Sequence, residues 1–406
     1  MRKTICIIAA ILCCVFLTFM VNVENTDKAY IEQTQEQAVE KAESKPVKSN
    51  GYEVELPWES NKVQYPEGIA ITVCGQDILY GEPVEGIAFE DDILIFDNVS
   101  VGNGEESTGV ELTGFNSIEI KLIGENVFDT AAAVNGCENI TFIGDGSIHS
   151  TGKISESNVL VQMVSLDLRD SVKVSEDVKS LYQRIDVYDD AFMTTTDVNS
   201  PTICLNGNGT FTAEHCTARN MIQLNDNSVF TVTGNPDDSE PYDSCAIRDV
   251  RYLYINDNSR FVASNYCEAT IGFTDKDAEL VISDNGILEI KGNASSEAIS
   301  QPLYSDRKVI MNDNAVVKIT DALVGFYGYN FIINGGSFSC EAVENGVPFL
   351  FEKKGFKING EVISQSHNEY SLIPYEDTNC YCIYADGEFV ESFSISVKQA
   401  EKTTEN

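Results

Sequence analysis

Aspartate returns at one position of a short bend that the sequence repeats. The bend is a triplet such as NDN, and Asp226, Asp257, Asp284 and Asp313 are its middle residues in four successive copies. If the copies stack, these carboxylates lie one above another, and like charges so close destabilise a structure unless something shares them. Calcium, a hard cation that binds oxygen ligands, would share them. We predict Ca²⁺ as an optional ligand here, with no cofactor required; the alternative is that aspartate suits a bend and faces solvent.

Tyrosine and arginine gather in three long segments between copies of the bend, at residues 234–252, 264–278 and 292–307. Insertions of this kind collect on one side of a solenoid and often form its binding face. Exposed aromatic rings stack on sugars, and a guanidinium binds a carboxylate through two parallel hydrogen bonds. The residues predicted to bind carbohydrate are Tyr242, Arg248, Arg251, Tyr304, Arg307 and Tyr327. The alternative is that the tyrosines pack in the core and the arginines pair with local aspartates.

The sequence carries no catalytic signature. Its three histidines, His149, His215 and His367, are scattered, and it has neither a G-x-S-x-G nor an H-E-x-x-H motif. A calcium-dependent lyase would use clustered aspartates and an arginine base, and residues of both types occur in the insertions. A non-catalytic protein is therefore favoured, and a lyase or glycoside hydrolase acting on acidic polysaccharide stays open.

The bends connect segments in which apolar and polar residues alternate. MIQLNDNSVFTV and YLYINDNSRFVA are two of the copies. Alternation with a period of two predicts strands with one buried face. The triplets recur 18 to 31 residues apart, which is typical of stacked coils that cover one another. We expect an all-β fold, a single parallel β-helix of about ten coils.

Two apolar columns are predicted to stack inside this β-helix. The column before the bend comprises Val187, Leu205, Leu224, Ile255, Ile282, Met311 and Ile333. The column after the bend comprises Val174, Met193, Phe211, Phe230, Phe261, Leu288 and Val317.

The chain is expected to divide into five parts. A basic start and an apolar run at 5–21 predict a signal peptide or uncleaved membrane anchor at 1–23, and 24–57 is a polar spacer. The β-helix with its N-terminal cap takes 58–342, because terminal coils leave an open edge that must be covered. A C-terminal β cap follows at 343–397, with a turn at 385–387, and then a polar tail at 398–406.

The net charge limits the partners that the chain can bind, and the number of cysteines limits its disulfide bonds. The net charge of −37 argues against nucleic acid as a partner and confines any membrane contact to the N-terminal segment. Nine of the twelve cysteines lie beyond the apolar run, and an odd number excludes a complete disulfide framework.

Runs such as SIEIKLIGENVF and ENITFIGDGSI, with their GEN, GDG and NDN bends, resemble right-handed parallel β-helix surface proteins of Gram-positive anaerobic bacteria. These are of the pectate-lyase-like, carbohydrate-binding type. The resemblance implies a right-handed β-helix, exported and displayed at the cell surface, that binds polysaccharide or acts in adhesion. An enzyme of the same fold and a purely structural spacer are the alternatives.

Overall fold

The structure is a computed structural model that describes residues 68–81, 83–102, 108–130, 132–150, 159–161, 165–176, 180–234, 246–264, 269–273, 278–292, 297–300, 308–328, 330–351, 355–375 and 380–400. The chain forms two compact units, Met1–Gln64 and Tyr65–Asn406. The predicted signal or anchor at 1–23 and the spacer at 24–57 lie outside the described residues. Among the described residues, no helix has the length and apolar character needed to span a membrane.

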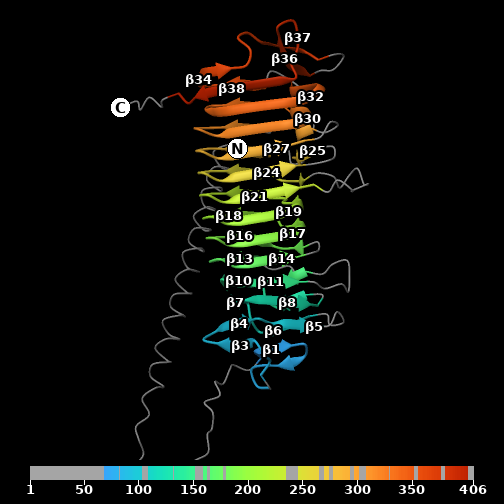
Figure 1. The fold of residues 1–406 in the computed structure, drawn as a ribbon, viewed down its shortest axis with the longest axis vertical. Helices are drawn as coiled ribbons and strands as arrows, with labels where there is room; N and C mark the ends of the chain where they lie inside the picture. The colour runs from blue at the N-terminus through green and yellow to red at the C-terminus, as the bar shows by residue number, and fades with distance from the viewer. Residues whose placement is uncertain are drawn as a thin grey trace, which may run out of the picture. The chain divides into compact units, whose positions relative to one another are not determined.

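A thirteen-stranded sheet, here called the long sheet, runs through the second unit. From β4 to β33 every neighbouring pair is parallel, and each strand comes from the next coil of the chain. Figure 1 shows these strands stacked in chain order. Its members are β3 (Ile87–Glu90), β4 (Ile93–Asp97), β7 (Ser117–Ile123), β10 (Asn139–Gly144), β13 (Ser165–Leu168), β16 (Arg184–Val187), β18 (Thr202–Leu205), β20 (Met221–Leu224), β23 (Tyr252–Ile255), β26 (Glu279–Ile282), β29 (Lys308–Met311), β31 (Phe331–Ile333) and β33 (Phe356–Ile358). This architecture confirms the predicted parallel β-helix.

The strand after each bend joins a second parallel sheet, and shorter strands extend it into the return of each coil. The strands after the bends are β5 (Ser100–Gly102), β8 (Glu125–Asp129), β11 (Ser147–Ser150), β14 (Lys173–Glu176), β17 (Phe192–Asn199), β19 (Thr210–Thr217), β21 (Val229–Thr233), β24 (Arg260–Ser264), β27 (Ile287–Lys291), β30 (Val316–Gly328) and β32 (Gly336–Phe351). The return strands are β15 (Ser180–Leu181), β22 (Ile247–Arg248), β25 (Ala269–Gly272) and β28 (Glu297–Ser300).

The core is made by the two predicted columns. Every residue of both columns is completely buried. Phe211, Phe230 and Phe261 are in register on neighbouring strands, and their ring centroids lie 4.9 and 5.3 Å apart. Because each coil covers the apolar face of the next, no coil could bury its core alone.

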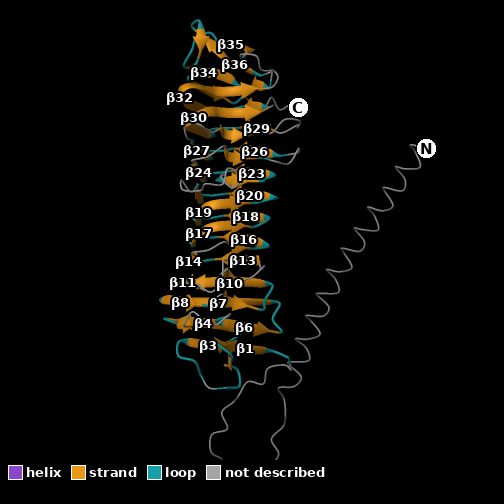
Figure 2. Cartoon of the chain, turned by 90° about the vertical axis from the view of Figure 1, so that its right-hand side faces the viewer, coloured by secondary structure: helices purple, strands orange, loops and turns teal. Residues whose placement is uncertain are grey.

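Both ends of the stack depart from parallel pairing. At the N-terminal end β3 pairs antiparallel with β4, and a small sheet holds β1 (Ala70–Val73), β2 (Gln76–Asp77), β6 (Val110–Thr113), β9 (Ala132–Asn135) and β12 (Val159–Val161). At the other end β38 (Ser392–Lys398) lies antiparallel to both β32 and β34 (Glu361–Gln365). Figure 2 shows this cap above β32. These antiparallel strands cover hydrogen-bonding edges that parallel coils would leave open.

The parallel pairing runs beyond the predicted limit at Ala342. β32 follows β30 to Phe351, and β33 is the last parallel strand of the long sheet, although both lie at least partly within the predicted C-terminal cap at 343–397. In the cap, β35 (Ser371–Pro374), β36 (Tyr381–Ala385) and β37 (Glu388–Phe389) pair antiparallel. The predicted turn lies between β36 and β37, with φ of 56° at Asp386 and 96° at Gly387, as a type I′ hairpin requires.

Candidate functional site

Hydrogen bonds join the middle aspartates of the bends from coil to coil, in what we call the aspartate ladder. These residues adopt left-handed backbone, with φ between 54° and 58°, which few residues other than Gly, Asn and Asp tolerate. The Oδ2 of Asp257 accepts the backbone N–H of Asp226 at 3.0 Å. The same bond repeats along the stack, always from a backbone N–H to the Oδ2 of an aspartate in the next coil. The donor and acceptor pairs are Gly144 and Asp170, Asp170 and Asp189, Gly207 and Asp226, Asp257 and Asp284, and Asp284 and Asp313. Each carboxylate thus satisfies a donor of the preceding coil.

Two amide ladders flank the aspartate ladder. In the first asparagine ladder, the amide Nδ2 of each residue donates to the side-chain oxygen of the preceding coil, at 2.7 to 3.1 Å. It comprises Asn206, Asn225 and Asn256, then Asn312, Asn334 and Asn359. The second asparagine ladder, Asn208, Asn227, Asn258, Asn285 and Asn314, is bonded in the same direction and begins on Asp190. The NDN triplet therefore gives three parallel columns of side-chain hydrogen bonds.

The calcium prediction for Asp226, Asp257, Asp284 and Asp313 stays a prediction. No group of three or more His, Cys, Asp or Glu side chains in the described ranges converges to hold a metal ion. Each of the four carboxylates already has one oxygen on a backbone N–H. That bond, together with the left-handed backbone, is a sufficient reason for aspartate at this position.

The predicted sugar-binding residues fall on two faces. Tyr242, Tyr304 and Arg307 lie outside the described residues. Arg248 ends β22 and Tyr327 lies in β30, and both are half-buried. The pairing of β22, β25, β28 and β30 puts these two in one row, three strands apart.

Arg251 lies on the other side, immediately before β23 of the long sheet, with its guanidinium 5.1 Å from the centre of the Tyr252 ring. Phe273, an aromatic residue that follows the return strand β25, is buried and packs in the core.

A charged cluster on the outer face of the long sheet was not predicted. It comprises Asp167 and Arg169 of the coil of β13 and Arg184 and Asp186 of β16, with Asp167 directly opposite Asp186. Arg184 donates through Nε and Nη2 to the two oxygens of Asp186, whose side chain is only 5% exposed. Arg169 donates to Asp167 at 3.4 Å. The two acids and two bases balance, so this is an electrically neutral patch on a chain of net charge −37.

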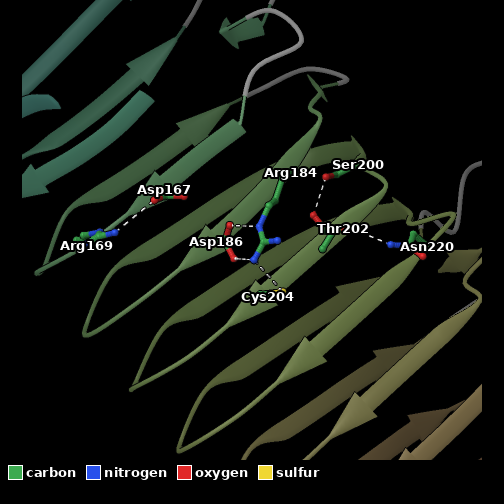
Figure 3. Close-up of polar contacts among 8 residues, drawn as sticks. All are labelled: Asp167, Arg169, Arg184, Asp186, Ser200, Thr202, Cys204 and Asn220. Carbon is green, nitrogen blue, oxygen red and sulfur yellow. Dashed lines mark hydrogen bonds and ion pairs between the residues drawn. The ribbon is translucent and has the colours of Figure 1, made fainter. Parts of the chain in front are cut away.

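Figure 3 shows how the cluster continues over the next two strands. Nη2 of Arg184, which also contacts Asp186, lies 3.8 Å from Sγ of Cys204. On the next strand, the Thr202 hydroxyl accepts a hydrogen bond from the Asn220 amide at 3.2 Å. Cys137, Cys204, Cys216 and Cys340 are free thiols. Hydroxyl, amide and guanidinium groups therefore lie side by side across β16, β18 and β20.

Burial and neighbouring charges shift the pKa values of this patch. Burial, and then repulsion from Asp186, raise the pKa of Asp167, while Arg169 and Arg184 oppose that rise. Burial, and to a smaller extent the negative charge of Asp186, raises the pKa of the Cys204 thiol to about 11. Burial, and then the negative charges of Asp186 and Asp167, raise the pKa of Tyr188. The guanidinium of Arg169 lies over the Tyr188 ring, 5.3 Å from its centre. At neutral pH the thiol and the phenol are therefore protonated, while Arg184 donates to both oxygens of Asp186.

A tyrosine pair lies further along the same face. The rings of Tyr252 and Tyr254 are nearly parallel, at 9°, with centroids 6.0 Å apart, and both side chains are half-buried. The register places Tyr254 in the row of Asp186, three strand steps away, which is about 14 Å. Cys204 and Gln223 fill the row between them. The charged cluster and the tyrosine pair therefore share one strip of the long sheet.

A signal for this strip was present in the sequence. The runs SLDLRD and RIDVYD repeat an aspartate at the same outward strand position in successive coils. The predicted binding residues come from the insertions, whereas this signal lies at the outward positions of the strands.

The fold and these side chains define a parallel β-helix repeat protein with a polar and aromatic strip along its longest sheet. Comparisons with protein-family models, with curated proteins and with solved structures gave no match.

Proposed function

We propose that this chain is an exported, surface-displayed β-helix protein of the pectate-lyase-like type that binds carbohydrate without catalysis, as in adhesion. The observation that carries the proposal is the strip on the long sheet. Tyr252 and Tyr254 offer ring faces to a sugar, and the charged cluster offers donors and acceptors along the same rows. Stacking on an aromatic ring together with a few oriented polar groups is the usual composition of a site for a small polar ligand.

Charge supports an acidic or neutral polysaccharide as the ligand. Most of a surface with net charge −37 repels an anionic sugar, whereas the cluster is neutral and about half of each of its two arginine side chains is exposed. Arg251 above Tyr252 adds a third cation to the same strip. A guanidinium can exchange part of its contact with a carboxylate for a bidentate contact with a uronic acid.

Export through the apolar run at 5–21, with the folded unit outside the cell, belongs to the same proposal. The basic residues Arg2 and Lys3 would stay on the inner side. Sequencing the N-terminus of the native protein tests this part, because a start between Val23 and Thr26 means a cleaved signal peptide and an intact Met1 means an anchor.

A glycan array followed by calorimetry tests the binding. Tyr254→Ala should weaken the affinity for the selected glycan about fivefold, as expected for loss of a stacking contact of about 1 kcal/mol. Tyr80→Ala is the matched control, because Tyr80 is an exposed tyrosine at the other end of the unit. An affinity that Tyr254→Ala and Arg184→Met leave unchanged rejects the strip as the site.

The second candidate is a glycoside hydrolase or lyase acting at the cluster. Asp167 and Asp186 are opposed carboxylates on neighbouring strands, one with a raised pKa and one paired with arginine. Environments that separate two carboxyl groups in this way suit acid and base roles. Assays for new reducing ends and for new unsaturated ends test for hydrolase and lyase activity, respectively. Activity in the wild type that both Asp167→Asn and Asp186→Asn abolish would replace the binding proposal with an enzyme.

A further inference from the structure

The three side-chain ladders end at different coils. The bend after Asn312, Asp313 and Asn314 is Asn334, Gly335 and Gly336. The first asparagine ladder therefore continues through Asn334 to Asn359. The aspartate ladder and the second asparagine ladder lose their side chains at the two glycines. A step is left at the C-terminal end of the stack, walled by Asn334 and Asn359.

The C-terminal segment enters this step. Gln399, the residue after β38, places its Oε1 2.9 Å from the backbone nitrogen of Asp313 and accepts its N–H. An aspartate of the next coil would otherwise supply that acceptor. A Cβ on Gly335 would lie 3.2 Å from the Cβ of Gln399 and 2.5 Å from the carbonyl oxygen of Asp313. Glycine at 335 thus leaves the space in which Gln399 closes the aspartate ladder.

Beside Gln399 an amide-lined depression of about 490 Å³ remains, formed by Asn312, Asp313, Asn334, Asn359, Gln399 and Ala400. Five of these six residues carry amide or carboxylate side chains. None of the six carries a positive charge, so the depression offers an anion no cationic partner.

The ladders use some polar groups of these lining residues and leave others available within the described chain. Asn359 gives one amide hydrogen to Asn334, so its Oδ1 and second hydrogen stay available within the described chain. Among the described residues, Asp313 uses Oδ2 for the N–H of Asp284 and keeps Oδ1. Over the same part of the chain, Gln399 uses Oε1 and keeps both hydrogens of Nε2. The depression therefore presents acceptors and donors side by side.

We propose that this depression is a binding site for one neutral, hydroxyl-rich sugar residue. Each sugar hydroxyl donates one hydrogen bond and accepts others, so adjacent hydroxyls match Asn359 Oδ1 and Asp313 Oδ1 as acceptors and Gln399 Nε2 as donor. The site lies at the C-terminal end of the stack, beyond the tyrosine strip. The choice of a sugar rests on the proposed carbohydrate function, although the residues are different.

Saturation-transfer NMR of the full chain with methyl β-glucoside, methyl β-galactoside and N-acetylglucosamine tests the site. Asn359→Ala should reduce the affinity for the sugar that binds about tenfold, the effect of losing a ligand hydrogen bond that leaves a partner unsatisfied. Gln399→Glu keeps an acceptor for Asp313 N–H and removes the Nε2 donor. It should weaken binding while the thermal unfolding midpoint stays unchanged, a separation that a merely structural role does not give.

Asn368→Ala, a change of an exposed asparagine in the same cap, is the control and should have no effect. Sugar signals that persist at full strength in both Asn359→Ala and Gln399→Glu overturn this inference. The same spectra with Tyr254→Ala separate it from the function proposed above. Binding lost only in Tyr254→Ala supports the strip alone, and binding lost only in Asn359→Ala and Gln399→Glu supports the depression alone.

Discussion

Asp257 accepts the backbone N–H of Asp226 at 3.0 Å although the two residues are 31 positions apart in the sequence. The contact joins two bends that have the same conformation, and it repeats in coils whose returns differ in length. The bend is thus the part of each coil that fixes the register, and the return segments vary without disturbing it.

Substitutions at Asp257 should separate the backbone and hydrogen-bond contributions. Asp257→Gly keeps the left-handed backbone and removes the acceptor, so the free energy of unfolding should fall by about 1 kcal/mol. Asp257→Ala also places an ordinary residue at φ 55° and should cost about 1–2 kcal/mol more. The midpoints of urea unfolding measure the loss of stability in both variants. Equal losses would show that the left-handed backbone at residue 257 contributes nothing to stability.

Calcium binding has a direct test at the same residue. If the aspartates bind Ca²⁺, added calcium should raise the thermal midpoint, EDTA should reverse it, and Asp257→Asn should reduce the shift because an amide is a weaker ligand. Asn tolerates the left-handed bend, so the apo protein keeps its fold. If calcium does not change the thermal midpoint, the role of these aspartates is to accept the backbone N–H of the preceding coil.

Phe230→Ala should destabilise the stack by about 3–5 kcal/mol, because it removes a completely buried ring between Phe211 and Phe261. Thr231→Ala, next along β21 and facing outward, should change the urea midpoint little. Equal effects of the two changes would contradict the assigned burial.

Arg184→Met should destabilise the protein by about 2 kcal/mol. The substitution leaves Asp186, 5% exposed, without its bidentate partner, and the effect stays below the ~3–5 kcal/mol of fully buried pairs because the side chain of Arg184 is 49% exposed. Adding Asp186→Asn should recover most of the loss. The double-mutant cycle is measured by urea unfolding, and strict additivity would mean that the pair is not coupled.

The pH dependence of stability should change in Asp167→Asn. The folded state raises the pKa of this carboxyl, so it binds the proton more tightly than the unfolded chain. The associated stability is present in acid and is lost as the pH rises above the ordinary value of 3.8 and through the folded pKa. Between pH 4 and 7 the variant should lose less stability than the wild type. Asp321→Asn, an exposed acid near Lys291, is the control and should follow the wild type.

The sequence predicted the parallel β-helix because its two apolar columns repeat in every coil, and Leu224 and Phe230 are buried as expected. It underestimated the extent, since β32 keeps parallel pairing to Phe351 without an NDN bend. The glycines at 335 and 336 ended the visible motif before the coils ended.

The candidate site was harder to predict. The NDN pattern pointed to stacked aspartates but could not reveal that Asp257 bonds to a backbone N–H, because that depends on the left-handed φ and on coil register. The charged cluster depends on which outward residues of successive strands meet. Asp167 and Asp186 become opposed only when the return between them is correctly aligned.

The aspartate ladder also bears on the chemical ageing of this protein. Asn206 precedes Gly207, and deamidation at such a pair begins when the glycine nitrogen attacks the asparagine side chain to form a succinimide, which makes asparagine a thermolabile residue. Here the N–H of Gly207 is held by Asp226 at 2.9 Å, and the Asn206 amide oxygen accepts from Asn225. Neither group can turn toward the other while the coils stay stacked. Asn206 should therefore keep its amide in the folded chain and lose it once the coils separate.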